Sequence, residues 1–278
     1  MNRGRLTVMA VSNSLRQVRG RVQGYFRLSR ILNFLSICCF LAGVLYVISM
    51  LVYPWFVSPR GWKHVQLVWD RWQGLNVGML AFLSSVIAFN ISRYNAEQQR
   101  AREFLAAKAF LPQAFSELSE YFRSSASVLA SAWGRQGNEN IDIDPPQLPS
   151  AYREIFEKCI RHATPEVGQY FVGILVQMQV HGARMREFFR GDDGIIRINS
   201  GRSNLITYLY RLGQLQALIN KNFDFARNID PFDSKPLDWE DFRNAFGNLN
   251  IWYDHYVVDD RTNLEGFTKR AIERNNPN

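Results

Sequence analysis

The stretch ILNFLSICCFLAGVLYVISMLVY, residues 31–53, decides the fold of this chain. It contains no charged residue, and the charge-free region around it extends from Arg30 to Arg60. A helix over these residues rises about 35 Å, which is enough to cross a hydrocarbon layer of about 30 Å. Each of its Leu, Ile, Val and Phe side chains favours insertion by roughly 0.3 to 0.6 kcal/mol. We therefore predict a membrane-spanning helix here, in an apolar region too long for the core of a cleaved signal peptide.

A second uncharged stretch covers residues 72–92, where Asn76, Ser84, Ser85 and Asn90 interrupt the apolar side chains. About twenty residues suffice to span a bilayer, so we predict a second span, with a re-entrant or buried helix as the alternative. The two spans define a transmembrane hairpin over residues 31–92. A basic arm, residues 1–30, precedes the hairpin, and a domain of residues 93–278 follows it.

Basic residues close to the two spans predict the orientation, because cytoplasmic flanks are enriched in Lys and Arg. The connector has only Arg60, Lys63 and Arg71, whereas seven arginines precede the first span and four basic residues follow the second. We expect both termini to be cytoplasmic, in a plasma (inner) membrane of bacterial type. The residues expected to set this topology are Arg16, Arg19, Arg21, Arg27, Arg30 and Arg93.

The distribution of charge argues against a nucleic-acid partner. Residues 1–135 carry 16 Lys and Arg against 5 Asp and Glu, whereas residues 136–278 carry 17 against 20. A basic excess often indicates nucleic-acid binding. Here the excess lies beside apolar segments and the polar half is slightly acidic, so membrane orientation is the better interpretation.

The connector between the spans is rich in tryptophan. Trp62, Val65, Trp69 and Trp72 recur at steps of three, four and three, which is typical of one face of a helix. Trp prefers the level of the lipid headgroups, so we expect an amphipathic helix on the outer interface, anchored by these three tryptophans and Trp55. The arm of residues 1–30 either lies on the anionic inner leaflet or only enforces the orientation.

Small residues inside the spans suggest where helices pack, because they let backbones approach closely in lipid. The partner is either the other span or a second copy. Neither span contains Asp, Glu, Lys, Arg or His, which argues against a transporter. The two asparagines lie away from the small residues, so no continuous polar pore lining is expected. An oligomeric pore lined by serine hydroxyls is the alternative. The expected packing residues are Gly43, Gly78, Ala81, Ser85 and Ala88.

Residues 93–278 are expected to be all-α, a cytoplasmic helical bundle. The second span continues to residue 108 without a break, and Pro112 should kink the helix or start a new one. Asp238 is a candidate N-cap, and residues 194–199 have the only strand-like alternation. Apolar periodicity predicts helices over residues 111–132, 151–162, 165–189, 203–226, 239–249 and 263–273.

No catalytic, cofactor or metal site is expected. The chain has no phosphate-binding loop, no dinucleotide fingerprint, no H-E-x-x-H and no G-x-S-x-G. Cys159 and His162 share a helix face and form a conceivable thiolate pair, but a buried thiol is the simpler interpretation. The carboxylates near residues 139–144 and 192–193 fit no calcium loop.

These patterns favour a non-enzymatic membrane protein whose cytoplasmic helical domain mediates protein–protein interaction or self-association, as a scaffold or sensor. Its partners would be the bilayer and either further copies or a helical protein. One alternative is a membrane-permeabilising effector of a bacterial cell-suicide or anti-phage defence system. A second alternative is a membrane-bound enzyme without a recognisable motif.

The small residues of the second span lead to a first prediction. Gly78→Leu and Ser85→Leu insert bulky side chains where we expect close packing, so each should weaken self-association or destabilise the hairpin. Chemical cross-linking of the full chain in detergent and its thermal unfolding measure these two effects. Unchanged cross-linking and unchanged stability in both variants would show that these positions do not pack.

Overall fold

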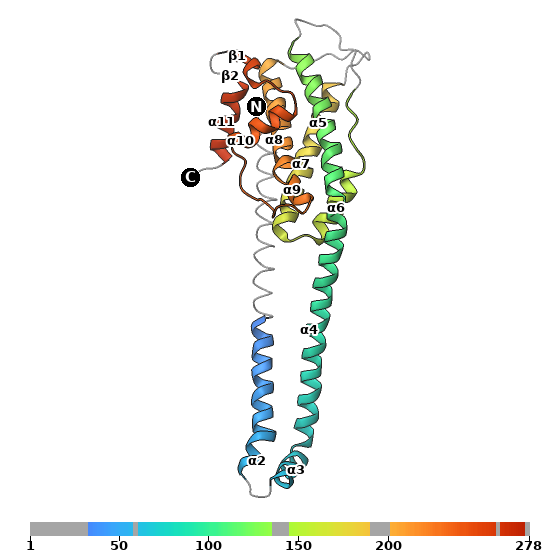
Figure 1. The fold of residues 1–278 in the computed structure, drawn as a ribbon, viewed down its shortest axis with the longest axis vertical. Coiled ribbons are helices and arrows are strands. Elements are labelled where there is room, and N and C mark those ends of the chain that lie inside the picture. The colour runs from blue at the N-terminus through green and yellow to red at the C-terminus, as the bar shows by residue number, and fades with distance from the viewer. Residues whose placement is uncertain (1–32, 58–60, 135–144, 190–200, 260–261, 276–278) are drawn as a thin grey trace. The chain divides into compact units, whose positions relative to one another are not determined.

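The chain is all-α, with two long helices that are apolar enough to cross a membrane. The computed structural model describes residues 33–57, 61–134, 145–189, 201–259 and 262–275 (Figure 1). These residues divide into two compact units, Met1–Gln99 and Arg100–Asn278, each with its own contacts. The basic arm and the strand-like residues 194–199 lie outside the described residues.

The first unit contains two long apolar helices. The first helix, Asn33–Val57, is α-helical up to residue 47 and continues through the π-helical turn η1 (Ile48–Val52) and α2 (Tyr53–Val57). The connector holds α3 (Trp62–Arg71), where the sequence predicts an amphipathic helix. Gly61 precedes α3 with a φ of +47°, which only glycine adopts at little cost. The second long helix is α4 (Gln73–Lys108), whose last residues belong to the second unit. We call the first helix and the part of α4 in the first unit the helix pair.

The second unit, here called the helical unit, packs its helices around α8 and a core of phenylalanines. The α8 helix contacts α5, α7, α10 and α11. Phe115, Phe156 and Phe171 are fully buried and lie within 6.3 Å of one another, measured between ring centroids. Besides the end of α4, the elements are α5 (Leu111–Trp133), α6 (Tyr152–His162), α7 (Pro165–Phe188), α8 (Arg202–Lys221), α9 (Phe223–Ala226), α10 (Trp239–Asn248), η2 (Tyr253–His255), β1 (Val257–Asp259), β2 (Thr262–Asn263) and α11 (Leu264–Asn275).

Several expectations about the helices are confirmed. The helix after the second apolar stretch continues to Lys108, and a new helix starts at Leu111 with Pro112 in its first turn. Asp238 caps α10: its carboxylate accepts a hydrogen bond from the Asp241 backbone N–H at 2.9 Å, and the Asp241 side chain returns the contact. This reciprocal arrangement satisfies two of the N–H groups that a helix start leaves unpaired.

One expectation about the helical unit is wrong, and one feature of it was not expected. The helix expected over residues 203–226 breaks at Asn222, because its side chain both donates to and accepts from the Asp233 backbone at 3.2 Å. That tertiary contact outweighs the local helical preference. No pattern in the sequence indicated the antiparallel pair β1–β2, which joins strands of only three and two residues.

A glycine in α8 leads to a stability prediction. A Cβ on Gly213 would lie 2.3 Å from Phe246 Cε1, and Phe246 is fully buried. Gly213→Ala should therefore destabilise the helical unit by about 1 to 3 kcal/mol through overpacking. At an exposed helix position the same substitution would stabilise, because Ala has a higher helix propensity than Gly. Chemical denaturation of the full chain in detergent, followed by circular dichroism, measures the change.

Gly173 of α7 provides the matched control, because nothing lies within 4 Å of the place that a Cβ would take there. Gly173→Ala should raise the free energy of unfolding by up to about 1 kcal/mol. A Gly213→Ala variant as stable as Gly173→Ala would contradict the close contact between α8 and α10.

Candidate functional site

The helix pair contacts itself through one narrow face on each helix, which we call the seam. The least exposed residues on each helix recur at alternating steps of three and four, the spacing of coiled-coil contacts. Contacts join the start of one helix to the end of the other, so the two helices run antiparallel. The seam consists of Ser36, Cys39, Gly43, Tyr46 and Met50 on the first helix and Asn76, Met79, Leu83, Val86 and Asn90 on α4.

Gly43 forms the closest apolar contact of the seam. It is buried, and a Cβ added to it would lie 3.1 Å from Leu83 Cδ2. The missing side chain therefore lets a leucine of α4 approach the backbone of the first helix. A small residue allows this kind of close approach between two helices.

A chain of hydrogen bonds closes the end of the seam next to the connector. The Tyr46 hydroxyl donates to Asn76 Oδ1 at 2.7 Å, and Asn76 Nδ2 donates to the Trp69 carbonyl at 3.0 Å. The Trp69 indole N–H in turn donates to the Met50 carbonyl at 3.2 Å. Pro54 explains that last bond: it has no N–H, so it cannot make the usual α-helical bond to the carbonyl four residues earlier.

The opposite end of the seam is also polar. The Ser36 hydroxyl donates to Asn90 Oδ1 at 3.3 Å, and Asn90 Nδ2 donates to the Val86 carbonyl at 2.9 Å. One turn further, Arg93 donates to Asn33 Oδ1 at 2.9 Å and pairs with Glu97 at 3.2 Å. The seam therefore has an apolar middle and a hydrogen-bonded group at each end.

The predicted packing residues fall in two different places. Gly43 lies in the seam, whereas Gly78, Ala81, Ser85 and Ala88 are exposed on another face of α4. Those four residues therefore do not pack against the first helix. Packing against a second copy stays a prediction.

The predicted anchors and topology residues are also spread out. Trp55, Trp62 and Trp72 are about half exposed, while the Trp69 indole N–H donates to the carbonyl of Met50, a seam residue. Among the topology residues, Arg93 lies at the end of the seam. The remaining five, Arg16, Arg19, Arg21, Arg27 and Arg30, lie outside the described residues.

The sequence interpretation did not anticipate the polar pairs of the seam. Asn76 and Asn90 were treated as interruptions of the apolar stretch, but both face the first helix. Their separation of fourteen residues, two complete heptads, was the available signal. On its own it does not identify the partners Tyr46 and Ser36, which depend on the register between the helices.

Among the described residues of the helical unit, the titratable groups near Cys159 do not form a reactive cluster. Burial raises the pKa of Cys159 to about 12, which disfavours a thiolate, and His162 Nδ1 contacts Glu103 Oε2 at 2.9 Å instead. Burial lowers the pKa of Lys108, whose ammonium lies 3.7 Å from the ring centroid of Phe225. Within the described part of the chain, no group of three His, Cys, Asp or Glu side chains is arranged to hold a metal ion.

Comparison with family models, with curated proteins and with solved structures gave no match.

The seam leads to a prediction about Tyr46. Tyr46→Phe removes the donor to Asn76 and leaves its buried carbonyl oxygen without that partner. Hydrogen bonds between membrane helices contribute about 0.6 kcal/mol on average and up to about 1.7 kcal/mol. Hydrogen exchange of the full chain in lipid nanodiscs should show amides of α3 and the start of α4 exchanging a few times faster.

Tyr53→Phe is the matched control, because the Tyr53 side chain is 65% exposed and lies outside the seam. Its exchange should equal that of the unmodified chain. Equal exchange in the Tyr46→Phe variant would mean that the Tyr46–Asn76 bond does not hold the two helices together.

Proposed function

We propose that this chain is a two-pass membrane protein and that its cytoplasmic helical unit binds other proteins, without catalysing a reaction. The observation that supports the first part most strongly is the surface of the helix pair. Outside the seam, large apolar side chains point outward on every side, including Phe34 at 68%, Phe40 at 70% and Val77 at 63% exposure. A helix that is apolar all round needs an apolar environment, and a bilayer provides it.

The length and internal bonding of the helix pair fit that environment. The first helix has 25 residues and rises about 37 Å, more than the hydrocarbon thickness of about 30 Å. Polar side chains of the seam are paired within it, as Tyr46 is with Asn76. Pairing of this kind is favoured in lipid, where no water replaces a lost hydrogen bond.

The orientation rests on charge. Basic residues are frequent in the arm and around Arg93 and are sparse in the connector, which also carries Asp70. With both flanks of the hairpin cytoplasmic, the helical unit lies in the cytoplasm.

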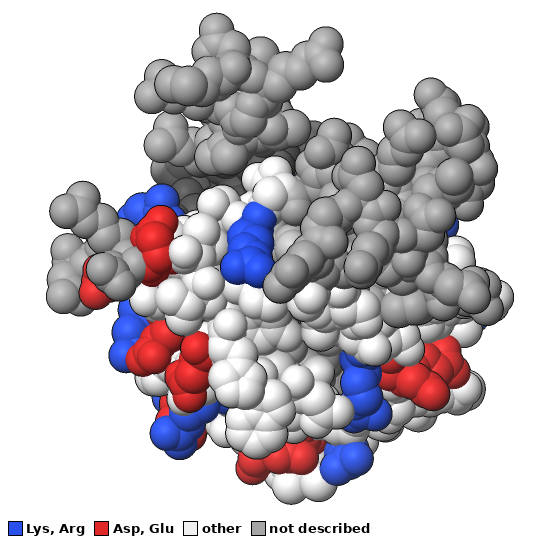
Figure 2. Space-filling view, turned by 90° about the horizontal axis from the view of Figure 1, so that it is seen from above, with Lys and Arg blue, Asp and Glu red and all other residues white. Residues whose placement is uncertain are grey.

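An interaction role for the helical unit is supported by its surface. The α7 helix has no charged residue from Val167 to Ala183, and Val172, Val176 and Val180 form an exposed row along it. Figure 2 shows Lys and Arg interspersed with Asp and Glu on the visible described surface, rather than a field of one sign. An exposed apolar row, together with the mixed signs of charge on the visible surface, suits a protein partner better than a nucleic acid.

A membrane-permeabilising effector is the second candidate. It is favoured by the exposed row Gly78, Ala81, Ser85 and Ala88, which a further copy could contact, and by the continuity of α4 from the helix pair into the helical unit. An effector of this kind would assemble through its hairpins and open the bilayer.

One experiment separates the two candidates. The full chain is expressed under a tight promoter in cells carrying a membrane-potential dye, and the detergent-solubilised protein is analysed by affinity capture. The interaction protein should leave the potential unchanged and retain a defined partner, and Val176→Glu should abolish that retention. Depolarisation with growth arrest would instead favour the effector.

Ala130→Glu is the control for Val176→Glu, because it introduces the same charge at an exposed position of a different helix, α5. Partner retention should survive this substitution. Loss in both variants would show only that added negative charge on the helical unit is harmful, and would contradict a specific role for the valines.

A further inference from the structure

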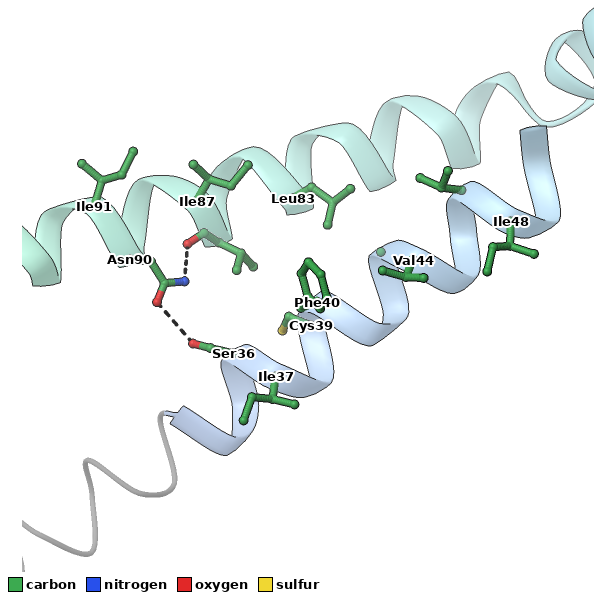
Figure 3. Close-up of a pocket in the computed structure, with 13 residues that line it drawn as sticks. Ser36, Ile37, Cys39, Phe40, Val44, Ile48, Leu83, Ile87, Asn90 and Ile91 are labelled. Atoms are coloured by element: carbon green, nitrogen blue, oxygen red, sulfur yellow. Dashed lines mark hydrogen bonds between the residues drawn. The ribbon is translucent and has the colours of Figure 1, made fainter. Parts of the chain in front are cut away.

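A groove runs along one flank of the helix pair (Figure 3). Its volume is about 750 Å³, and its walls come from both helices, with Phe40, Val44 and Val47 on one side and Leu83, Ile87 and Ile91 on the other. Gly43 contributes to the space, since it has no side chain where Leu83 approaches the first helix. Most of the lining is aliphatic, so an apolar occupant fits it.

One end of the groove is polar, but the polar groups there are paired. Ser36 donates to Asn90, and Asn90 donates to the Val86 carbonyl, as Figure 3 shows. These side chains need no hydrogen bond from an occupant. An extended hydrocarbon chain could therefore lie along the groove without leaving buried polar atoms unpaired.

Beyond this polar end the helix pair carries a guanidinium. Arg93 lies one turn after Asn90 on the same face of α4, and Tyr94 follows Ile91 in the same way. A guanidinium has five N–H donors. Two of the Arg93 donors make hydrogen bonds to Asn33 and Glu97. The Glu97 carboxylate is 60% exposed, and exposed ion pairs contribute little, so a phosphate can compete with it.

We propose that the groove binds one anionic phospholipid of the inner leaflet, with an acyl chain between the helices and the phosphate at Arg93. This inference rests on the proposed membrane topology. The charge of Arg93 complements a phosphate, which guanidinium groups bind through paired N–H donors. Basic positions between membrane helices on the cytoplasmic side are recurrent sites for anionic headgroups. The tyrosine at position 94 lies at headgroup level, where Tyr is favoured.

Native mass spectrometry of the full chain tests the proposal. The protein is released from nanodiscs of equal phosphatidylglycerol and phosphatidylcholine with identical acyl chains, and the retained lipid is counted. We expect one retained lipid per chain, with phosphatidylglycerol preferred. Arg93→Gln should reduce that preference about fivefold, the factor for one basic residue beside anionic lipid. Arg71→Gln, at the other end of the hairpin, should keep it.

A second pair of variants tests the groove itself. Val44→Trp fills the groove from its rim without entering the seam, so it should remove most retained lipid. Leu45→Trp places the same ring on the neighbouring residue, which is 67% exposed and does not line the groove. That variant should retain lipid normally.

Three results would overturn the lipid site. These are equal retention of the two lipids by the unmodified chain, equal retention by the Val44→Trp and Leu45→Trp variants, and a dimer that Val44→Trp abolishes, which would assign the groove to a second hairpin. Alkaline carbonate extraction separates this failure from failure of the topology. A chain that stays in the membrane pellet but shows no lipid preference refutes the lipid site alone, whereas an extracted chain refutes the proposed function.

Discussion

The pairing of polar side chains between two otherwise apolar helices is the interaction on which the first unit depends. Asn76 and Asn90 would each be costly in an apolar environment without a partner. The Tyr46 and Ser36 hydroxyls supply those partners, and they sit near opposite ends of the seam. Only one antiparallel register satisfies both pairs, so the polar groups fix the alignment that apolar packing around Gly43 leaves loosely defined.

The helical unit is organised by burial instead, with polar contacts at its helix ends. Arg100, in the last turns of α4, donates to the carbonyls of His162 and Ala163 at 3.1 and 2.7 Å. These carbonyls end α6, where a helix leaves acceptors unpaired and carries partial negative charge. Glu103 contacts the His162 ring from the same side of α4. The end of α4 is therefore a structural member of the helical unit, and in the proposed topology it is also the link to the membrane.

Local signals in the sequence predicted most helices, because apolar periodicity, Pro112 and the Asp238 cap act over a few residues. The break at Asn222 could not be predicted in this way, since it depends on the distant Asp233 backbone. The same reason explains the candidate site. Gly43 was identified as a packing residue, but the seam partners of α4 depend on the register between helices, and Gly78 belongs to a different face.

Cysteine labelling tests the central proposal, a hairpin that crosses the bilayer twice, most directly. In a chain whose three native cysteines are replaced by alanine, single cysteines are introduced at Gln66 in the connector and at Ser234 in the helical unit, both exposed positions. A maleimide that cannot enter intact cells should label the connector position only, and both positions after permeabilisation. Labelling of position 234 in intact cells, or protection of position 66 until permeabilisation, would contradict the proposed topology.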